Sequence, residues 1–222
     1  MKKLFVIFFI FLSYGCTEKY QGELLFIPED SSSNFQFPYY LFIPEETPRD
    51  SLLNLIIEPN NTGFVSDEFE NHREKAERTA SIDYYVGNYL AVNLDLPLLV
   101  PVFPRPESDW KIYTHSLDRD AMLQKDNSLE RLDLQLMAMA NDAKHRLNEM
   151  GYLLKVKYIL TGFSASGTFV NRFSLLHPEK VEAVAAGGLN GLLMLPIDSM
   201  RNTALEYPVG IADFEKLTAK PF

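Results

Sequence analysis

Apolar and β-branched residues occur along this chain in short runs that polar turns separate. Runs of this length and composition are typical of buried strands, and turn residues such as Pro, Gly, Asn and Asp mark their ends. The pattern predicts six strands, over residues 23–27, 35–43, 53–58, 98–103, 154–160 and 181–186.

Three longer segments show apolar residues at helical spacing instead. One spans residues 127–150, where Asn127 and Glu130 resemble a capping box and Gly151 closes the segment. A second covers residues 67–91, and a third follows Ser164 and ends before Pro178. Strand hairpins come first and strands then alternate with helices, so we expect a mainly parallel sheet flanked by helices.

The junction between the fifth strand and the third helix carries the clearest chemical signal. It reads Gly162-Phe-Ser164-Ala-Ser166-Gly167. A nucleophilic serine at a sharp strand-to-helix turn needs small residues two positions to either side, because the strained backbone brings those neighbours together. Gly162 and Ser166 meet this requirement, and Gly167 follows directly, so the sequence predicts a nucleophile elbow with Ser164 as the nucleophile.

With this elbow, the chain resembles secreted esterases of the α/β-hydrolase superfamily, of the feruloyl-esterase and polyhydroxybutyrate-depolymerase kind. The resemblance covers roughly residues 20–222 and is strongest from Gly162 to Gly188, where the elbow, its helix and the next strand follow in order. It implies an α/β-hydrolase fold, and a serine esterase that forms an acyl-enzyme on Ser164. It also implies a small-molecule or polymer ester as substrate, with neither a metal nor an organic cofactor.

Attack on an ester carbonyl builds negative charge on oxygen, which preorganised N–H groups must hold. The amide of Ala165 is the first expected donor. The resemblance places the second in the loop after the third strand, where Asn60 and Asn61 are the candidates, although this loop departs from the usual His-Gly-Gly sequence. An ordinary polar turn is the alternative interpretation of these two residues.

A serine nucleophile also needs a base and an acid, and the resemblance implies that both follow Ser164 in the chain. The one histidine after it is His177, which lies 13 positions further on. That separation is about 20 Å along a helix at about 1.5 Å per residue, so we expect His177 to be a helix-end residue. We therefore expect the acid and the histidine to lie beyond residue 222, with the last strands of the fold, and the 222-residue chain alone to be inactive.

The other polar candidates have weaker support. Three histidines precede Ser164, and His115 could act as base or, with Trp110 and Tyr113, shape a pocket, although a structural role is the simplest interpretation. Two aspartates follow Ser164, and we expect both to be turn or surface residues rather than the catalytic acid. The residues concerned are His72, His115 and His145, and Asp198 and Asp213.

The N-terminal residues predict the cellular location of the protein. Two lysines precede an apolar run from Leu4 to Leu12 that is too short to span a bilayer and leads to Gly15-Cys16. This resembles a bacterial lipoprotein signal over residues 1–15, which would make Cys16 the lipid-attached first residue, followed by a tether over 16–22 and a domain over 23–222. The protein would then be held by its lipid at the cell envelope, facing outside the cytoplasm. An ordinary secretory signal is the alternative.

The charge of the chain indicates which class of partner is disfavoured. The chain has a net charge of −9, and removal of residues 1–15 would leave 19 basic against 30 acidic residues, a net charge of −11. Such acidity disfavours nucleic-acid binding. Two hypotheses remain: a lipid-anchored serine esterase, or a noncatalytic surface-anchored α/β domain that binds a polymer, lipid or protein through the same edge of the sheet.

Overall fold

The computed structural model describes residues 22–218, apart from residue 83 and residues 190–193. The predicted signal peptide, Cys16 and the tether as far as residue 21 lie outside the described residues. Within the described part of the chain, no helix is long and apolar enough to cross a membrane.

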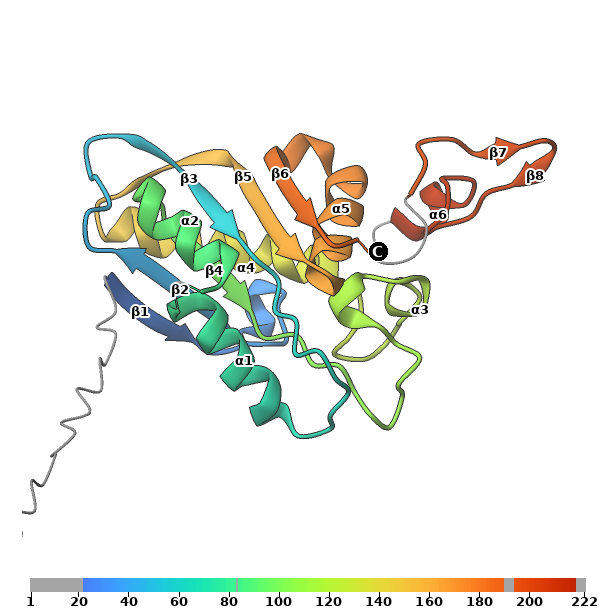
Figure 1. Ribbon diagram of the computed structural model, residues 1–222, viewed down its shortest axis with the longest axis horizontal. Coiled ribbons are helices and arrows are strands. Elements are labelled where there is room, and N and C mark those ends of the chain that lie inside the picture. The colour runs from blue at the N-terminus through green and yellow to red at the C-terminus, as the bar shows by residue number, and fades with distance from the viewer. Residues whose placement is uncertain (1–21, 83, 190–193, 219–222) are drawn as a thin grey trace, which may run out of the picture.

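Six strands form one sheet, as the hydrophobic pattern predicts, in the order β1-β2-β4-β3-β5-β6 (Figure 1). The pairs β1–β2 and β2–β4 are antiparallel, whereas β4, β3, β5 and β6 run parallel to one another. The strands are β1 (Gly22–Ile27), β2 (Tyr39–Pro44), β3 (Leu52–Ile57), β4 (Leu98–Pro101), β5 (Leu153–Phe163) and β6 (Val181–Gly187). The prediction of a mainly parallel sheet flanked by helices is confirmed.

Alternate residues of the strands build two cores, one on each face of the sheet, because side chains of a strand point to opposite faces in turn. Leu41, Leu55 and Leu99 belong to the larger core, under α4 (Leu132–Glu149) and α5 (Ala165–Leu176). Their neighbours Phe42, Ile56 and Leu98 belong to the smaller core, under α1 (Phe69–Ser81) and α2 (Val86–Leu94). Helices therefore cover both faces of the sheet.

The segment predicted as one helix over residues 67–91 is two helices. Ile82 leaves α1 in an extended conformation, and Tyr85 is extended before α2 begins. The side-chain amide of Asn88 donates to the carbonyl oxygen of Ala80 at 2.6 Å, which caps the last turn of α1. The periodic pattern continues across this break because both helices bury alanines against the same face of the sheet.

The capping box predicted at Asn127 and Glu130 is also wrong. Asn127 accepts a hydrogen bond from the amide of Leu129 and so closes a turn. Arg131 then adopts a left-handed conformation, with φ of 50°, directly before α4. The side chain of Glu130 accepts instead from the amide of Asp126. The helix therefore begins about one turn later than the sequence pattern indicates.

The remaining elements are short. A 3-10 turn, η1 (Ser31–Ser33), follows β1, and η2 (Thr114–Ser116) and α3 (Arg119–Met122) follow β4. After α5 come η3 (Pro178–Lys180), a small hairpin of β7 (Ser199–Met200) and β8 (Thr203–Ala204), and α6 (Phe214–Thr218). Tyr207, next to this hairpin, is buried and donates its hydroxyl hydrogen to the carbonyl of Leu117.

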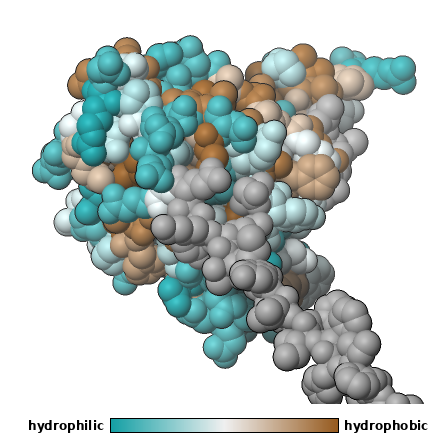
Figure 2. Space-filling view, turned by 60° about the vertical axis from the view of Figure 1, so that its left-hand side comes forward, coloured by the Kyte–Doolittle hydropathy of each residue, from teal (hydrophilic) through white to brown (hydrophobic). Residues whose placement is uncertain are grey.

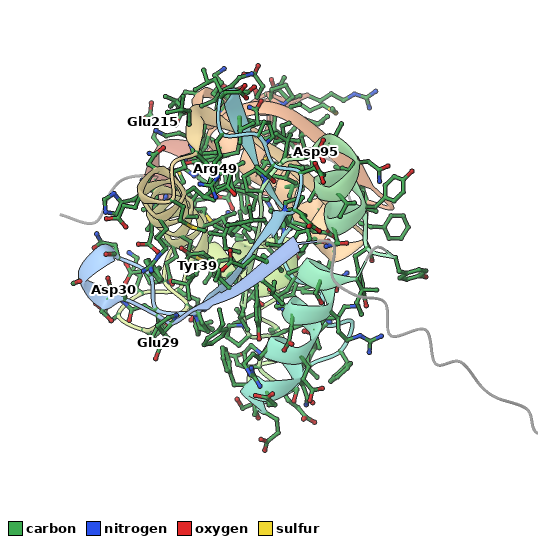
Figure 3. The ribbon with its side chains drawn as sticks, turned by 90° about the vertical axis from the view of Figure 1, so that its left-hand side faces the viewer. Glu29, Asp30, Tyr39, Arg49, Asp95 and Glu215 are labelled. Carbon is green, nitrogen blue, oxygen red and sulfur yellow. The ribbon has the colours of Figure 1, made fainter. Side chains whose placement is uncertain are left out.

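Most charged side chains are at least partly exposed, although Glu58, Arg131, Asp133, Arg172 and Asp213 are buried. Tyr39 of β2 points into the core, whereas Glu29 and Asp30 lie at one end of the molecule (Figure 3). Figure 2 shows hydrophilic residues interspersed with smaller apolar areas over one face.

Candidate active site

The carboxyl ends of the parallel strands meet at one edge of the sheet, which is where open α/β sheets bind their ligands. The nucleophile elbow forms at this edge. Ser164 has φ of 61° and ψ of −118°, a region that residues with a side chain rarely adopt, and it links β5 directly to α5. Its amide donates to the carbonyl oxygen of Gly187 at the end of β6, at 2.9 Å. The predicted strained backbone at Ser164 is therefore present.

The neighbours of Ser164 have no room for larger side chains. A Cβ atom on Gly162 would lie 2.5 Å from the backbone carbon and oxygen of Ser166, and one on Gly167 would lie 2.4 Å from the carbonyl oxygen of Gly187. Ser166 fits because its buried hydroxyl turns back onto the strand, where it accepts from the amide and donates to the carbonyl of Phe163, both at 3.0 Å. This explains how serine replaces the glycine that is usual at this position.

The loop after β3 reaches the elbow through Asn61. Its side-chain amide donates to the carbonyl oxygen of Phe163 at 3.3 Å. Asn60 points inward instead and exchanges two hydrogen bonds with the backbone of Phe103, at 2.9 and 3.0 Å. The structure thus brings Asn61 to the elbow, beside the first residue of α5, Ala165, whose amide lies in the first turn and has no acceptor within the helix.

His115 is in the interior, not on an overhanging loop. It is fully buried, and its Nε2 donates to the carbonyl oxygen of Phe103 at 2.8 Å. Burial lowers the pKa of the His115 imidazole to about 3, helped by the positive potential of His72 and Arg105 and opposed by the hydrogen bond to Phe103. His115 is therefore a neutral structural residue, and the alternative roles as base or as part of a pocket with Trp110 and Tyr113 are wrong.

His72 and His145 each have a partner of their own. His72 is buried and hydrogen-bonded to Thr62 and Ser66, and burial lowers its pKa. His145 lies on the exposed side of α4, 3.3 Å from Glu149.

His177 ends α5, as predicted, and its Nε2 lies 2.8 Å from Oδ2 of Asp133. Asp133 is fully buried and also receives two hydrogen bonds from Arg131. Burial alone would raise the pKa of Asp133, but the hydrogen bonds from His177 and Arg131 hold it below its ordinary value. This buried cluster fastens the end of α5 to the start of α4, at the opposite end of the helix from Ser164.

The two aspartates after Ser164 have different surroundings. Asp198 is exposed next to the β7–β8 hairpin. Asp213 is nearly buried, accepts from the amide of Tyr207 at 2.8 Å, and lies 2.6 Å from Arg119. Asp213 therefore fastens the C-terminal segment to α3 in a structural role.

Solved structures provide an independent comparison. No protein-family model and no curated protein sequence matches the chain. A poly(aspartic acid) hydrolase from Sphingomonas sp. KT-1 superimposes with a TM-score of 0.55 over 90% of this chain and 68% of that one, at 15% sequence identity. The chain has the α/β-hydrolase fold.

Two further solved structures, a depolymerase and an esterase, are also similar to the chain. They are the poly(3-hydroxybutyrate) depolymerase LpqC of Bordetella parapertussis, at 17% identity and a TM-score of 0.49, and a thermostable esterase, at 18% identity and a TM-score of 0.45. The alignments cover 91% and 75% of this chain. The chain spans 64% of the depolymerase and 40% of the esterase.

The chain also has a buried carboxyl group near the elbow that the sequence analysis missed. Glu58 follows β3, is 6% exposed, and its Oε2 accepts from the amide of Gly87 at 2.5 Å. Burial raises the pKa of Glu58 to about 7, although the Gly87 amide and the charge of Lys75 favour the ionised form. The sequence gives no signal for this, because the residues that bury Glu58 come from other elements.

Proposed function

We propose that this protein is a serine hydrolase that cleaves carboxylic esters through an acyl-enzyme on Ser164. The observation that carries the proposal is the strained backbone of Ser164, at the carboxyl edge of the sheet between Gly162 and Gly167. Such strain costs about 1–3 kcal/mol, and it is retained where it serves to present a nucleophile.

In the proposed reaction, the hydroxyl oxygen of Ser164 attacks the ester carbonyl carbon and its proton passes to a histidine. The backbone amide of Ala165 holds the oxyanion together with an N–H group of the β3 loop, for which Asn61 is better placed than Asn60, because only Asn61 contacts the elbow. The alcohol leaves with the proton from the histidine, and water activated by the same histidine then releases the acid from Ser164.

We also propose that the histidine and the acid come from sequence beyond residue 222. All four histidines of the chain lie in its described part, and each is assigned to another contact: His72, His115 and His177 in buried hydrogen bonds, and His145 beside Glu149 on α4. The lipid anchor at Cys16 and the place at the bacterial cell envelope, outside the cytoplasm, remain part of the proposal.

The test is hydrolysis of p-nitrophenyl acetate by the protein expressed from its complete reading frame. Ser164→Ala should lower kcat by a factor of about 10⁴ or more, because no other group replaces the nucleophile. Ser174→Ala is the matched control, since Ser174 lies on the same helix and its hydroxyl donates to the nearby carbonyl of Asn171. Full activity in the Ser164→Ala variant would refute the proposal and favour the noncatalytic binding domain.

A further inference from the structure

A cavity of about 380 Å³ lies directly beside the elbow. Its lining comes from the end of β3, from α1, from the connection to α2 and from the elbow, so two neighbours of Ser164 in the chain form part of its wall. Its lining residues include Glu58, Asn61, Lys75, Tyr85, Phe163 and Ser166. A cavity of this volume is within the range of small-molecule sites.

One hydrogen-bond acceptor of this cavity lacks a donor among the described residues. Asn61 donates from its side-chain amide to the carbonyl of Phe163, and within the described part of the chain its buried Oδ1 has no partner. Glu58 lines the same cavity, and its Oε2 accepts from the amide of Gly87. A buried acceptor without a donor is costly, and an ionised carboxylate can only accept, so Asn61 and Glu58 together favour a ligand that brings hydrogen-bond donors.

The charges around the cavity restrict the type of donor. The ammonium group of Lys75 bonds the hydroxyl of Tyr85 at 2.8 Å and disfavours a cationic ligand in the same space. Glu58 disfavours an anionic one. The donor is therefore neutral, and a hydroxyl group fits best.

The remaining wall is aromatic and apolar. Tyr84 and Phe163 are 85% and 62% exposed, high values for side chains of this size, and both line the cavity together with Tyr85 and Val86. Exposed aromatic faces around a polar centre suit a ring that has one apolar face.

We propose that this cavity is a subsite for the substrate and that it binds a ring-bearing part of the ester that carries a free hydroxyl group, which donates to Glu58. Asn61 Oδ1 is the acceptor for a further hydroxyl. The inference rests on the proposed function, because it assigns the bound group to the ester that Ser164 attacks, and it makes Glu58 and Asn61 the residues that determine specificity.

The test measures binding and not turnover, so it is independent of hydrolysis. Two pairs of probes differ only in methylation of the hydroxyl: 4-methylphenol with 4-methylanisole, and cyclohexanol with methoxycyclohexane. At pH 8.5, where Glu58 is ionised and can only accept, we expect each alcohol to bind about tenfold more tightly than its ether in NMR titrations. A preference for the alcohol in the first pair alone would identify the ring as aromatic. A preference in both pairs would show that the cavity also accepts alicyclic rings.

The preference should depend on the protonation state of Glu58. At pH 5.5 the neutral carboxyl group can also donate to an ether oxygen, so the ratio of the two dissociation constants should fall toward one. The other titratable side chains that line the cavity are Lys75, Tyr84 and Tyr85. Because this comparison uses the wild-type protein, it does not depend on whether a variant folds.

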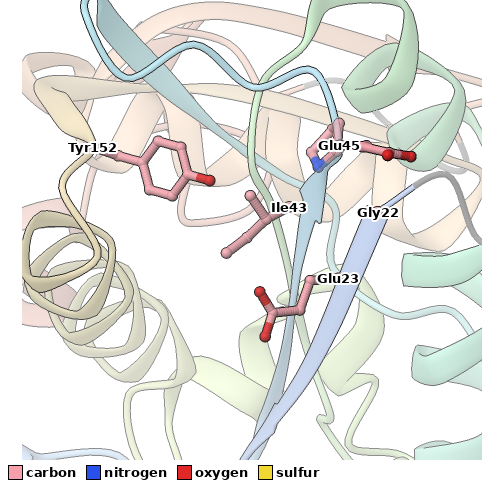
Figure 4. A pocket seen from close by; sticks show the side chains of 6 residues that line it. Gly22, Glu23, Ile43, Glu45 and Tyr152 are labelled. Atoms are coloured by element: carbon pink, nitrogen blue, oxygen red, sulfur yellow. The ribbon is translucent and has the colours of Figure 1, made fainter.

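Glu58→Gln provides the second arm. The amide oxygen of the glutamine can keep the hydrogen bond from Gly87. Its second terminal atom is then an NH₂ donor in place of a carboxylate acceptor, so the preference for the alcohol over the ether should also disappear at pH 8.5. The matched control is Glu23→Gln, in the hollow around Ile43 and Tyr152 at the opposite edge of the sheet (Figure 4), which should leave the preference unchanged.

Equal binding of alcohol and ether by the wild-type protein at pH 8.5 would overturn the proposal, and so would an undiminished preference in Glu58→Gln. Neither result would bear on Ser164, because none of the probes is an ester. Loss of hydrolysis in Ser164→Ala with no alcohol preference would thus leave the proposed function standing and refute this subsite alone.

Discussion

The backbone conformation of Ser164 is unfavourable. It is possible because two nearby glycines, Gly162 and Gly167, have no side chains. Of these, Gly162 is the most restricted, because both the carbon and the oxygen of the Ser166 carbonyl occupy the place of a side chain. The elbow therefore depends on residues that perform no chemistry themselves.

Gly162→Ala should destabilise the protein by about 1–3 kcal/mol and lower esterase activity, because the added methyl group pushes the start of α5 away from β5. Gly63→Ala is the comparison: Gly63 has φ of 88°, and no heavy atom lies within 4 Å of an added Cβ. That change should cost only about 1 kcal/mol from backbone strain. Urea unfolding and ester hydrolysis measure the two effects, and equal losses in both variants would contradict the crowding at Gly162.

The sequence predicts this residue-level chemistry only in part. The small residues around Ser164 are adjacent in the chain, so their spacing is visible in the sequence. Glu58 is not, because its pKa is raised by burial under other elements, against the opposing hydrogen bond from Gly87, 29 positions away. Asn60 and Asn61 could be separated only by seeing that one points inward and the other toward Phe163.

Among the elements, α5 is attached at both ends by different means. Its start is fixed by the elbow, and its end is fixed by the contact of His177 with Asp133. Arg131 and His177 both bond the buried carboxylate of Asp133. This carboxylate therefore contributes more to the stability of the fold than either partner does.

His177→Gln should lower the free energy of unfolding by about 1–3 kcal/mol and leave the dependence of kcat on pH unchanged. Asp133→Asn should cost about 3–5 kcal/mol, because it removes the buried carboxylate charge that the guanidinium of Arg131 and the ring of His177 both contact. Denaturant unfolding gives the stabilities and a pH–rate profile tests the role in catalysis. A shifted pH–rate profile in His177→Gln would show that His177 takes part in the reaction.

Element boundaries show why sequence patterns fail locally. The apolar spacing over residues 67–91 is continuous, yet Asn88 caps α1 and a second helix begins. Likewise Asn127 and Glu130 have the right spacing for a capping box, but their side chains bond other amides. The strands were predicted more closely, because residues of β2, β3 and β4 alternate between the two cores.

For the whole molecule, acid should be destabilising through its interior histidines. His72 and His115 lie with ring centroids 5.6 Å apart, and burial lowers the pKa of both. The unfolded chain takes up protons near pH 6.5, whereas folded His115 does so only near pH 3. The contribution of these histidines to the free energy of unfolding is therefore at its highest above pH 6.5, and it decreases as the pH falls from 6.5 toward 3.

The contribution of these histidines to the free energy of unfolding should fall as the pH is lowered from 7.5 to 4, whereas Glu58, whose pKa is raised to about 7, acts in the opposite sense. His115→Gln should therefore make the loss of stability toward acid smaller. The exposed His145 offers the control, and His145→Gln should leave the dependence unchanged. Identical pH dependence in all three proteins would contradict a neutral buried His115.

The order of the strands in the sheet could not be predicted from the sequence, since the hydrophobic pattern identifies strands and not their neighbours. The parallel arrangement followed from the alternation of strands and helices. It is this arrangement that brings Asn61 after β3, Ser164 after β5 and Gly187 at the end of β6 to one edge.

The most direct test of the central claim is to treat the protein, expressed from its complete reading frame, with a fluorophosphonate probe and identify the modified residue by peptide mass spectrometry. The account predicts one labelled residue, Ser164, with labelling abolished in Ser164→Ala and retained in Ser174→Ala. Labelling of a different serine, or equal labelling of Ser164→Ala, would contradict it.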